Sequence, residues 1–169
     1  MSALIDSLIA ELENEAATTR RVLERVPEDR FSWAPHPKSM TLGKLAQHVA
    51  EIPGKIADLL DPPESRIPFA PPPVATSRDE ILSILEQSVA NAVSKLRSWG
   101  DAYLMQDCRV MLGDRVAMAG PRIRWVRAAM LNHWYHHRGQ LTVYLRLLDV
   151  PVPAVYGPSA DEPVPATAG

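Results

Sequence analysis

The chain has 169 residues, 46% of them hydrophobic, and its 18 Lys and Arg against 20 Asp and Glu leave a formal net charge of -2. This length favours one compact domain, and the balanced charge excludes a general electrostatic attraction to nucleic acid or to anionic membranes. The single cysteine, Cys108, excludes an intrachain disulfide framework and a four-cysteine metal site.

Clustered prolines divide the sequence into proline-poor segments with helical periodicity and proline-rich connections. The first helix is predicted from an N-cap at Ser2 to about Pro27, because apolar residues recur every three or four positions from Leu4 onward. A second helix is predicted to begin at Thr41, which is suited to capping. Pro53 should kink or interrupt this helix, because proline lacks a backbone N–H.

Residues 61–76 read DPPESRIPFAPPPVAT and are too rich in proline for a helix, so we predict an extended crossover on the surface. Ser77 and Glu80 form a capping box, which predicts the start of a third helix. The inner face of this helix is predicted from residues at helical spacing: Ile81, Leu85, Ser88, Ala92 and Leu96.

A short β-hairpin is predicted around Gly113 and Asp114, since apolar residues flank this turn on both sides. The last helix is predicted as one continuous element from about Pro121 to about Leu148. The expected fold is all-α: an antiparallel four-helix bundle with a proline-rich crossover and a small β-hairpin before the last helix. We expect one domain over residues 1–162 and a flexible C-terminal tail over residues 163–169.

Three of the five histidines lie in the last helix, within LNHWYHHRGQ. His133 and His137 are four residues apart and share a helix face that the periodicity directs into the core, whereas His136 points elsewhere. His48 lies on the predicted inward face of the second helix, between Leu45 and Ile52. Three histidines from two helices can therefore meet inside the bundle.

Buried imidazoles favour a metal site, because each ring nitrogen needs a partner and a buried cationic ring is costly. One divalent cation would satisfy three rings, and zinc, nickel, iron or manganese accept such ligands while keeping a coordination position open. The alternative is a pair of hydrogen-bonded core or surface histidines without a metal.

Three segments resemble the DinB/YfiT-like metalloenzyme family: PHPKSMTLGKLAQHVAEIP, LNHWYHHRGQLTVYLRLL and VPAVYGPSADE. The resemblance covers about residues 1–162 and implies a DinB-like metal-binding four-helix bundle that is often dimeric. Matching the motifs residue by residue implies that His48, His133 and His137 are the ligands of a divalent metal ion. Relatives generally carry a polar residue at the position of Trp134, which we expect to face away from the site.

Relatives include transferases and isomerases that depend on low-molecular-weight thiols, so the resemblance implies a thiol-dependent transferase with a small-molecule substrate. A metal-bound thiol can lose its proton near neutral pH and attack an electrophile. A metal-dependent hydrolase and a non-catalytic, stress-related binding module with a structural metal are the alternatives. Gln140 and Tyr144, further along the same helix face, are candidates for contacting substrate or supporting the ligands, or else core polar groups.

Other residues are expected to have structural roles. Cys108 is predicted to be an incidental or buried thiol, and His36 a structural or solvated side chain. Arg122, Arg124 and Arg127 are expected to form surface ion pairs rather than a nucleic-acid site.

We expect a homodimer, from the family habit and because an exposed Trp134 would need cover. No signal-peptide core and no run of about 18 apolar residues is present, so we expect a cytoplasmic protein without membrane association.

Overall fold

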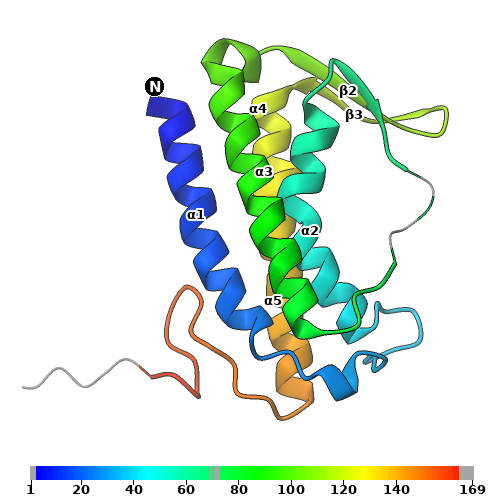
Figure 1. Cartoon of the computed structure of the whole chain (residues 1–169), viewed down its shortest axis with the longest axis vertical. Helices are drawn as coiled ribbons and strands as arrows, with labels where there is room; N and C mark the ends of the chain where they lie inside the picture. The colour runs from blue at the N-terminus through cyan, green and yellow to red at the C-terminus, as the bar shows by residue number, and fades with distance from the viewer. Residues whose placement is uncertain (1–2, 69, 71–72, 164–169) are drawn as a thin grey trace, which may run out of the picture.

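The computed structural model describes residues 3–68, 70 and 73–163. Its helices and strands, in chain order, are α1 (Ala3–Leu23), η1 (Glu28–Arg30), α2 (Leu42–Leu60), β1 (Glu64–Arg66), α3 (Arg78–Leu104), β2 (Asp107–Leu112), β3 (Arg115–Pro121), α4 (Arg122–Trp125), η2 (Val126–Asn132) and α5 (His133–Leu147). Four long helical columns form a bundle, and the sheet lies across one end of it (Figure 1). No helix in the described part of the chain is long and apolar enough to cross a membrane.

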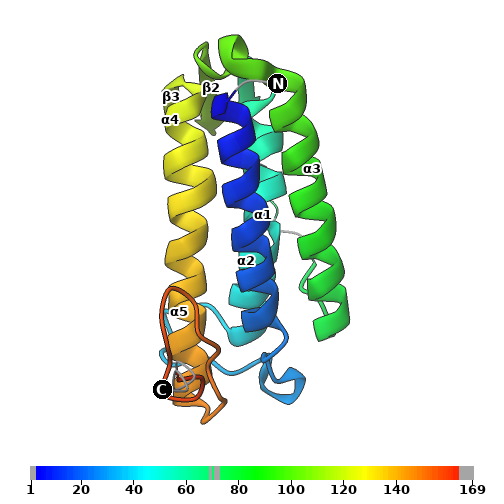
Figure 2. The same ribbon diagram turned by 90° about the vertical axis from the view of Figure 1, so that its left-hand side faces the viewer.

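The directions of the helices differ from the predicted antiparallel arrangement. Gly54 on α2 donates its N–H to Ser88 Oγ on α3 at 2.8 Å, and further along both helices Trp99 Nε1 donates to Asp61 Oδ1 at 2.7 Å. The residue numbers increase on both helices from the first contact to the second, so α2 and α3 are parallel. α1 and α5 both run in the opposite direction (Figures 1 and 2). The prediction is right for α1 against α3 and for α2 against α5, and wrong for the other two neighbouring pairs. The crossover causes this, because it returns the chain to the end where α2 began.

The crossover contains a strand that the sequence did not predict. Residues 64–67 are a proline-free run between Pro63 and Pro68, so every residue in the run has an N–H to donate. β1 pairs in parallel with β2, and the pairing is extended by Ile67 N–H donating to Met111 O at 2.8 Å. β2 pairs antiparallel with β3, which confirms the predicted hairpin, and the strand order is β1-β2-β3. The crossover then docks on α2, where Gln47 Oε1 accepts from Ala75 N–H at 2.6 Å.

The predicted starts of two helices are confirmed. Thr41 caps α2 by accepting from Lys44 N–H, and Ser77 caps α3 by accepting from Glu80 N–H at 3.2 Å. The predicted cap at Ser2 lies outside the described residues. α2 continues through Pro53 as one helix.

The last helix was predicted as one continuous α-helix, and this is wrong. The structure has α4, a π-helical segment η2 and α5 in succession. The wider π turn changes which residues face the core: Val126 and Leu131, five positions apart, are both buried. After this turn Trp134 points inward and is 0% exposed, so the expectation that Trp134 is exposed is wrong. His133 and His137 are rotated to the edge of the interior and are half-buried.

Arg122, expected on the surface, is 1% exposed and joins the sheet to the bundle. Its Nε donates to Leu60 O at 2.8 Å, and another guanidinium nitrogen donates to Gln106 O at 3.2 Å. The guanidinium also lies over the Tyr103 ring, 3.9 Å from its centroid. Arg122 directly follows β3, and its side chain reaches both the end of α2 and the start of β2.

The segment after α5 folds back along α1. Glu162 forms ion pairs with Arg21 and Arg25, and Asp161 pairs with Arg146 at 2.5 Å. These contacts fix the chain on the bundle as far as Glu162, where the predicted domain ends. Of the predicted tail, residues 164–169 lie outside the described residues.

Candidate metal centre

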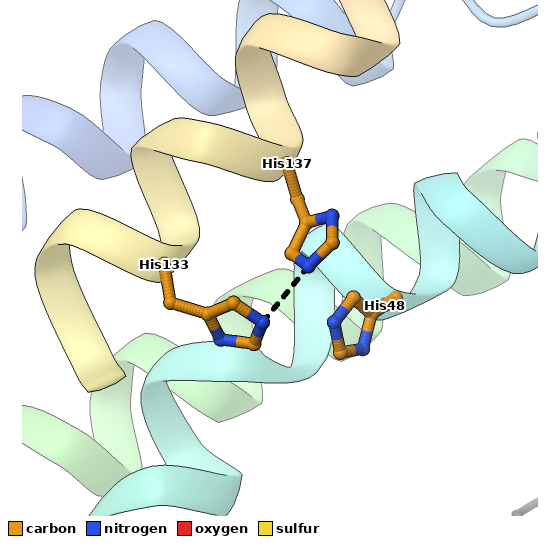
Figure 3. A group of neighbouring side chains, drawn as sticks. All are labelled: His48, His133 and His137. Atoms are coloured by element: carbon orange, nitrogen blue, oxygen red, sulfur yellow. Dashed lines mark hydrogen bonds between the residues drawn. The ribbon is translucent and has the colours of Figure 1, made fainter. Parts of the chain in front are cut away.

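Three imidazoles converge where α2 meets α5. His48 comes from α2, and His133 and His137 come from successive turns of α5 (Figure 3). Each offers one ring nitrogen, and these atoms lie within 4.8 Å of one another. The predicted trio is therefore brought together, at the half-buried rim of the helix interface rather than in the bundle core. His136 is exposed and is not part of this group.

The rings of the trio contact one another edge to face. Ring centroids are 4.6 Å apart for His48 and His137, 5.3 Å for His48 and His133, and 4.5 Å for His133 and His137. The shortest contact joins His133 Nε2 to His137 Nε2 at 2.8 Å. Two ring nitrogens at this separation need a proton or a cation between them, because two lone pairs repel.

The other ring nitrogen of His137 has its own partner. His137 Nδ1 lies 2.7 Å from Gln140 Oε1, an atom that can only accept, so the proton is on Nδ1. The backbone of Ala129, one turn earlier, acts on His133 to raise its pKa, and His133 Nε2 is directed at His137. The His137 Nε2 is thus left to present its lone pair toward the centre of the trio.

Burial keeps the trio neutral. Desolvation, followed by the neighbouring His137 and His133, lowers the pKa of His48 to about 4. Desolvation is also the main cause of the lowered pKa values of His133 and His137. Neutral imidazoles with converging lone pairs are the donor set that a divalent transition metal requires, so the residues present fit such an ion.

Charged side chains lie near His48 on α2. Lys55 lowers the pKa of His48 and Glu51 raises it, and these two residues form an ion pair with each other. Glu51 also accepts from Gln47 Nε2 at 2.7 Å. The carboxylate is therefore held by its own neighbours and does not belong to the trio.

The two candidate supporting residues are placed differently. Gln140 contacts His137 directly, as described above. The Tyr144 hydroxyl donates to Met40 O at 3.3 Å, and its ring meets Trp33 edge to face at 5.7 Å. Tyr144 thus ties α5 to the loop before α2 and does not contact the histidines.

The remaining sequence candidates have structural partners. Cys108 is buried in β2, and burial raises the pKa of its thiol, as expected for an unreactive cysteine. His36 is exposed, and its Nδ1 accepts from Lys38 N–H at 3.1 Å. Arg127 forms the expected surface ion pair with Glu11, at 2.5 Å.

Sequence reasoning missed two residues that flank the ligands on α5. Trp134 Nε1 donates to Val49 O, the main-chain oxygen of the residue after His48, at 2.8 Å. Arg138 is 1% exposed and reaches α1, where it donates to Thr19 Oγ1 at 3.1 Å and pairs with Glu15. One sequence signal could have indicated the contact between Trp134 and Val49. Pro53 has no N–H to donate to the carbonyl of Val49, four residues earlier, so that carbonyl needs another donor.

Two surface grooves have other linings. One of about 600 Å³ lies between α1 and α3, and one of about 310 Å³ lies between α2 and α3. Neither is lined by the three histidines.

Comparison with known proteins gives a consistent assignment. The model of the DinB family matches residues 1–166. A protein of Bacillus subtilis (strain 168) named uncharacterized protein YrdA is 25% identical over 166 residues, which cover 96% of this chain and 93% of YrdA.

Solved structures show the same fold. The DinB-like protein YjoA of Bacillus subtilis superposes with a TM-score of 0.67 at 17% identity, covering 88% of this chain and 96% of YjoA. A DinB-like protein of Bacillus cereus gives 0.67 at 23% identity, over 89% of this chain and 97% of its own. A protein of Exiguobacterium sibiricum described as a putative member of the DinB family gives 0.66 at 19% identity, over 91% and 97%.

Proposed function

The chain belongs to the DinB family, and on that basis we propose that it binds one divalent transition-metal ion through His48, His133 and His137. The observation that carries this proposal is the 2.8 Å approach of the Nε2 atoms of His133 and His137, with the His137 proton engaged by Gln140 at Nδ1. Zinc, nickel, iron and manganese are the candidate ions, since all accept imidazole ligands. Three protein ligands leave room for a further, exchangeable one.

For the reaction we propose a thiol-dependent transferase with a small-molecule substrate. A bound divalent ion supplies positive charge that lowers the pKa of a thiol or a water molecule beside it. The chain's own contribution is to hold that charge without neutralising it, because the three imidazoles carry none. Gln140 keeps the His137 proton on Nδ1, and the trio is only half-buried, so it is partly accessible to solvent.

Calorimetry of the zinc-loaded chain with a low-molecular-weight thiol tests the reaction class. Titrations in two buffers of different ionisation enthalpy report the protons released on binding. We expect thiol binding with release of close to one proton at pH values below the pKa of the free thiol. His133→Ala should abolish both. Thiol binding without proton release, or no binding, excludes the transferase, and hydrolase assays on the same sample then separate a hydrolase from a structural metal site.

We also propose a homodimer, formed through the α1·α3 groove instead of Trp134. The centre of this groove is lined by small and apolar side chains such as Ala17 and Val93. Its charges are arranged so that each end has an acid on one helix facing a base on the other: Glu13 with Arg97, and Arg20 with Glu86. A second copy related by a two-fold axis in the plane of this face places every acid against a base, whether the axis runs along the groove or across it.

The proposed location is the cytoplasm. The chain has one cysteine and so no intrachain disulfide, and the proposed thiol co-substrate requires a reducing compartment. We propose neither a nucleic-acid partner nor a membrane partner.

A further inference from the structure

A buried hydrogen bond joins the two histidine-bearing helices at the level of the trio. Trp134 Nε1 donates to the main-chain oxygen of Val49 at 2.8 Å, and both residues are 0% exposed. Trp134 directly follows His133, and Val49 directly follows His48. The bond therefore links the side chain of the residue after one proposed ligand to the main chain of the residue after another.

The Val49 carbonyl accepts this bond because α2 supplies it with no regular intrahelical donor. In an α-helix the carbonyl of residue 49 would accept from the N–H of residue 53, and Pro53 has no N–H. A buried carbonyl without a partner is unfavourable. Pro53 thus creates an acceptor inside the bundle, and the Trp134 indole satisfies it.

The π-helical segment η2 delivers Trp134 to this acceptor. η2 ends at Asn132, two residues before Trp134, and its wider turn rotates the start of α5 so that the indole points at α2. The same rotation places His133 and His137 at the half-buried rim, facing His48. A single rotation of α5 about its axis therefore places both the Trp134 indole and the two histidines.

We propose that Trp134 is a positioning residue for the metal centre: its bond to Val49, made available by Pro53, sets the spacing and rotation of α5 relative to α2 and so brings His133 and His137 to His48. This inference rests on the proposed metal site. It differs from a role in core packing alone, because it assigns the effect to the indole N–H and to its direction across the helix interface.

The experiment is a cycle of Trp134→Phe, Pro53→Ala and the double variant, measured by urea unfolding of the metal-free chain and by Co²⁺ titration. Phe keeps an aromatic ring and removes the donor. Ala at position 53 restores an N–H to α2, which can satisfy the Val49 carbonyl without reaching α5. Trp134→Phe is compared with the wild type, and the double variant is compared with Pro53→Ala. Changes that Pro53→Ala causes by itself therefore do not enter either comparison.

We expect Trp134→Phe to weaken Co²⁺ binding about 10- to 100-fold, the range typical of residues that orient metal ligands. It should also change the visible absorption of bound Co²⁺, which reports ligand geometry. In the Pro53→Ala background the urea midpoint should fall less, because the carbonyl is satisfied within the helix. The loss of Co²⁺ affinity should persist there, because a carbonyl oxygen accepts two hydrogen bonds, so the indole still links α5 to α2 in Pro53→Ala until Trp134→Phe removes its N–H.

Trp99→Phe is the matched control. Its indole Nε1 donates to Asp61, at the far end of α2 from His48. This variant should lose stability and keep the Co²⁺ affinity of the wild type.

Three results would overturn the inference. One is wild-type Co²⁺ affinity in Trp134→Phe, and another is recovery of affinity together with stability in the double variant. If Trp134→Phe does not fold, benzothienylalanine at position 134 replaces the N–H with sulfur at nearly constant shape, and wild-type Co²⁺ affinity in that protein is the third. A wild-type chain that binds no Co²⁺ overturns the proposed metal site itself, while the unfolding cycle still reports whether the indole satisfies the Val49 carbonyl.

Discussion

His137 Nδ1 lies 2.7 Å from Gln140 Oε1, one turn further along α5. The amide oxygen has no proton to donate, so the contact assigns the ring proton to Nδ1 and directs the Nε2 lone pair at His133. A residue outside the trio thereby sets the tautomer of one proposed ligand.

Gln140→Leu should weaken zinc binding by about 10- to 100-fold, because the ring loses the acceptor that orients it and raises its basicity. Gln140→Glu keeps an acceptor and should retain the affinity. Competition titration with a chromophoric chelator measures both values. Tyr144→Phe is the control, since its hydroxyl bonds to Met40, and a loss of affinity as large as that of Gln140→Leu would contradict this assignment.

His48→Ala, His133→Ala and His137→Ala should each reduce the bound metal from one ion per chain to none at micromolar concentration. Two remaining imidazoles hold a divalent ion much less tightly than three. His136→Ala should keep a full ion, because His136 lies outside the converging group. Elemental analysis of protein purified without a histidine tag measures the stoichiometry. Loss of the ion in His136→Ala, with retention in His137→Ala, would show that His136 is the ligand in place of His137.

Asp61→Asn should lower the free energy of unfolding at pH 7 by about 1 kcal/mol, the usual contribution of such hydrogen bonds. Lys95, followed by Trp99, lowers the pKa of Asp61 in the folded chain. The unfolded carboxyl therefore binds protons more readily than the folded one, so this stabilisation is present above about pH 4, near the unfolded pKa, and is lost as the pH falls below it. Urea unfolding at pH 7 and pH 3 should show the difference between the proteins shrinking with acid.

Asp58→Asn is the comparison for this carboxyl. Asp58 lies 3.9 Å from the same lysine but is much more exposed, so the effect should be within about 0.5 kcal/mol. A difference between Asp61→Asn and wild type that stayed constant from pH 7 to pH 3 would show that charge is not its cause.

Arg122→Met should destabilise the chain by about 2–4 kcal/mol. The substitution keeps much of the buried volume but leaves the Leu60 carbonyl without its donor, while the Gln106 carbonyl keeps only the main-chain N–H of residue 122. Thermal unfolding followed by circular dichroism measures the loss. Arg124→Met, at an exposed position, should change stability by less than about 0.5 kcal/mol, and equal effects of the two changes would refute the anchoring role of Arg122.

Ala17→Glu should convert the proposed dimer to a monomer, because it places a charge at the exposed centre of the α1·α3 groove. Light scattering coupled to size exclusion at micromolar concentration measures the mass. Ala102→Glu, an equally exposed change on the last turn of α3 outside the groove, should leave the dimer intact. A wild-type monomer, or a dimer that persists in Ala17→Glu, excludes this interface.

Much of the helical framework followed from local pattern. Thr41 and Ser77 mark the starts of their helices because a cap needs only the N–H groups of the next turn. The spacing of His133 and His137 placed both rings on one face for the same reason, since it depends only on helix geometry. The hairpin around Gly113 is also local, because a two-residue turn brings its strands together.

Other features depended on partners distant in the chain. β1 forms because a proline-free run meets β2, and Arg122 is buried because the sheet closes over the end of the bundle. Neither partner is visible in the local periodicity of the residue concerned. The parallel course of α2 and α3 was likewise decided by where the crossover returns the chain.

The candidate site shows the same division most clearly. Helical spacing together with the family motif identified which three histidines belong together. Their meeting at a half-buried rim depends on packing between helices, because the π turn in η2 gives the core position to Trp134 and rotates the histidines outward. A reading of helical periodicity assumes that every turn has the same width, so it cannot anticipate a π turn. The hydrogen bond between the buried Trp134 indole and the Val49 carbonyl stabilises that turn, and it forms only when α5 packs against α2.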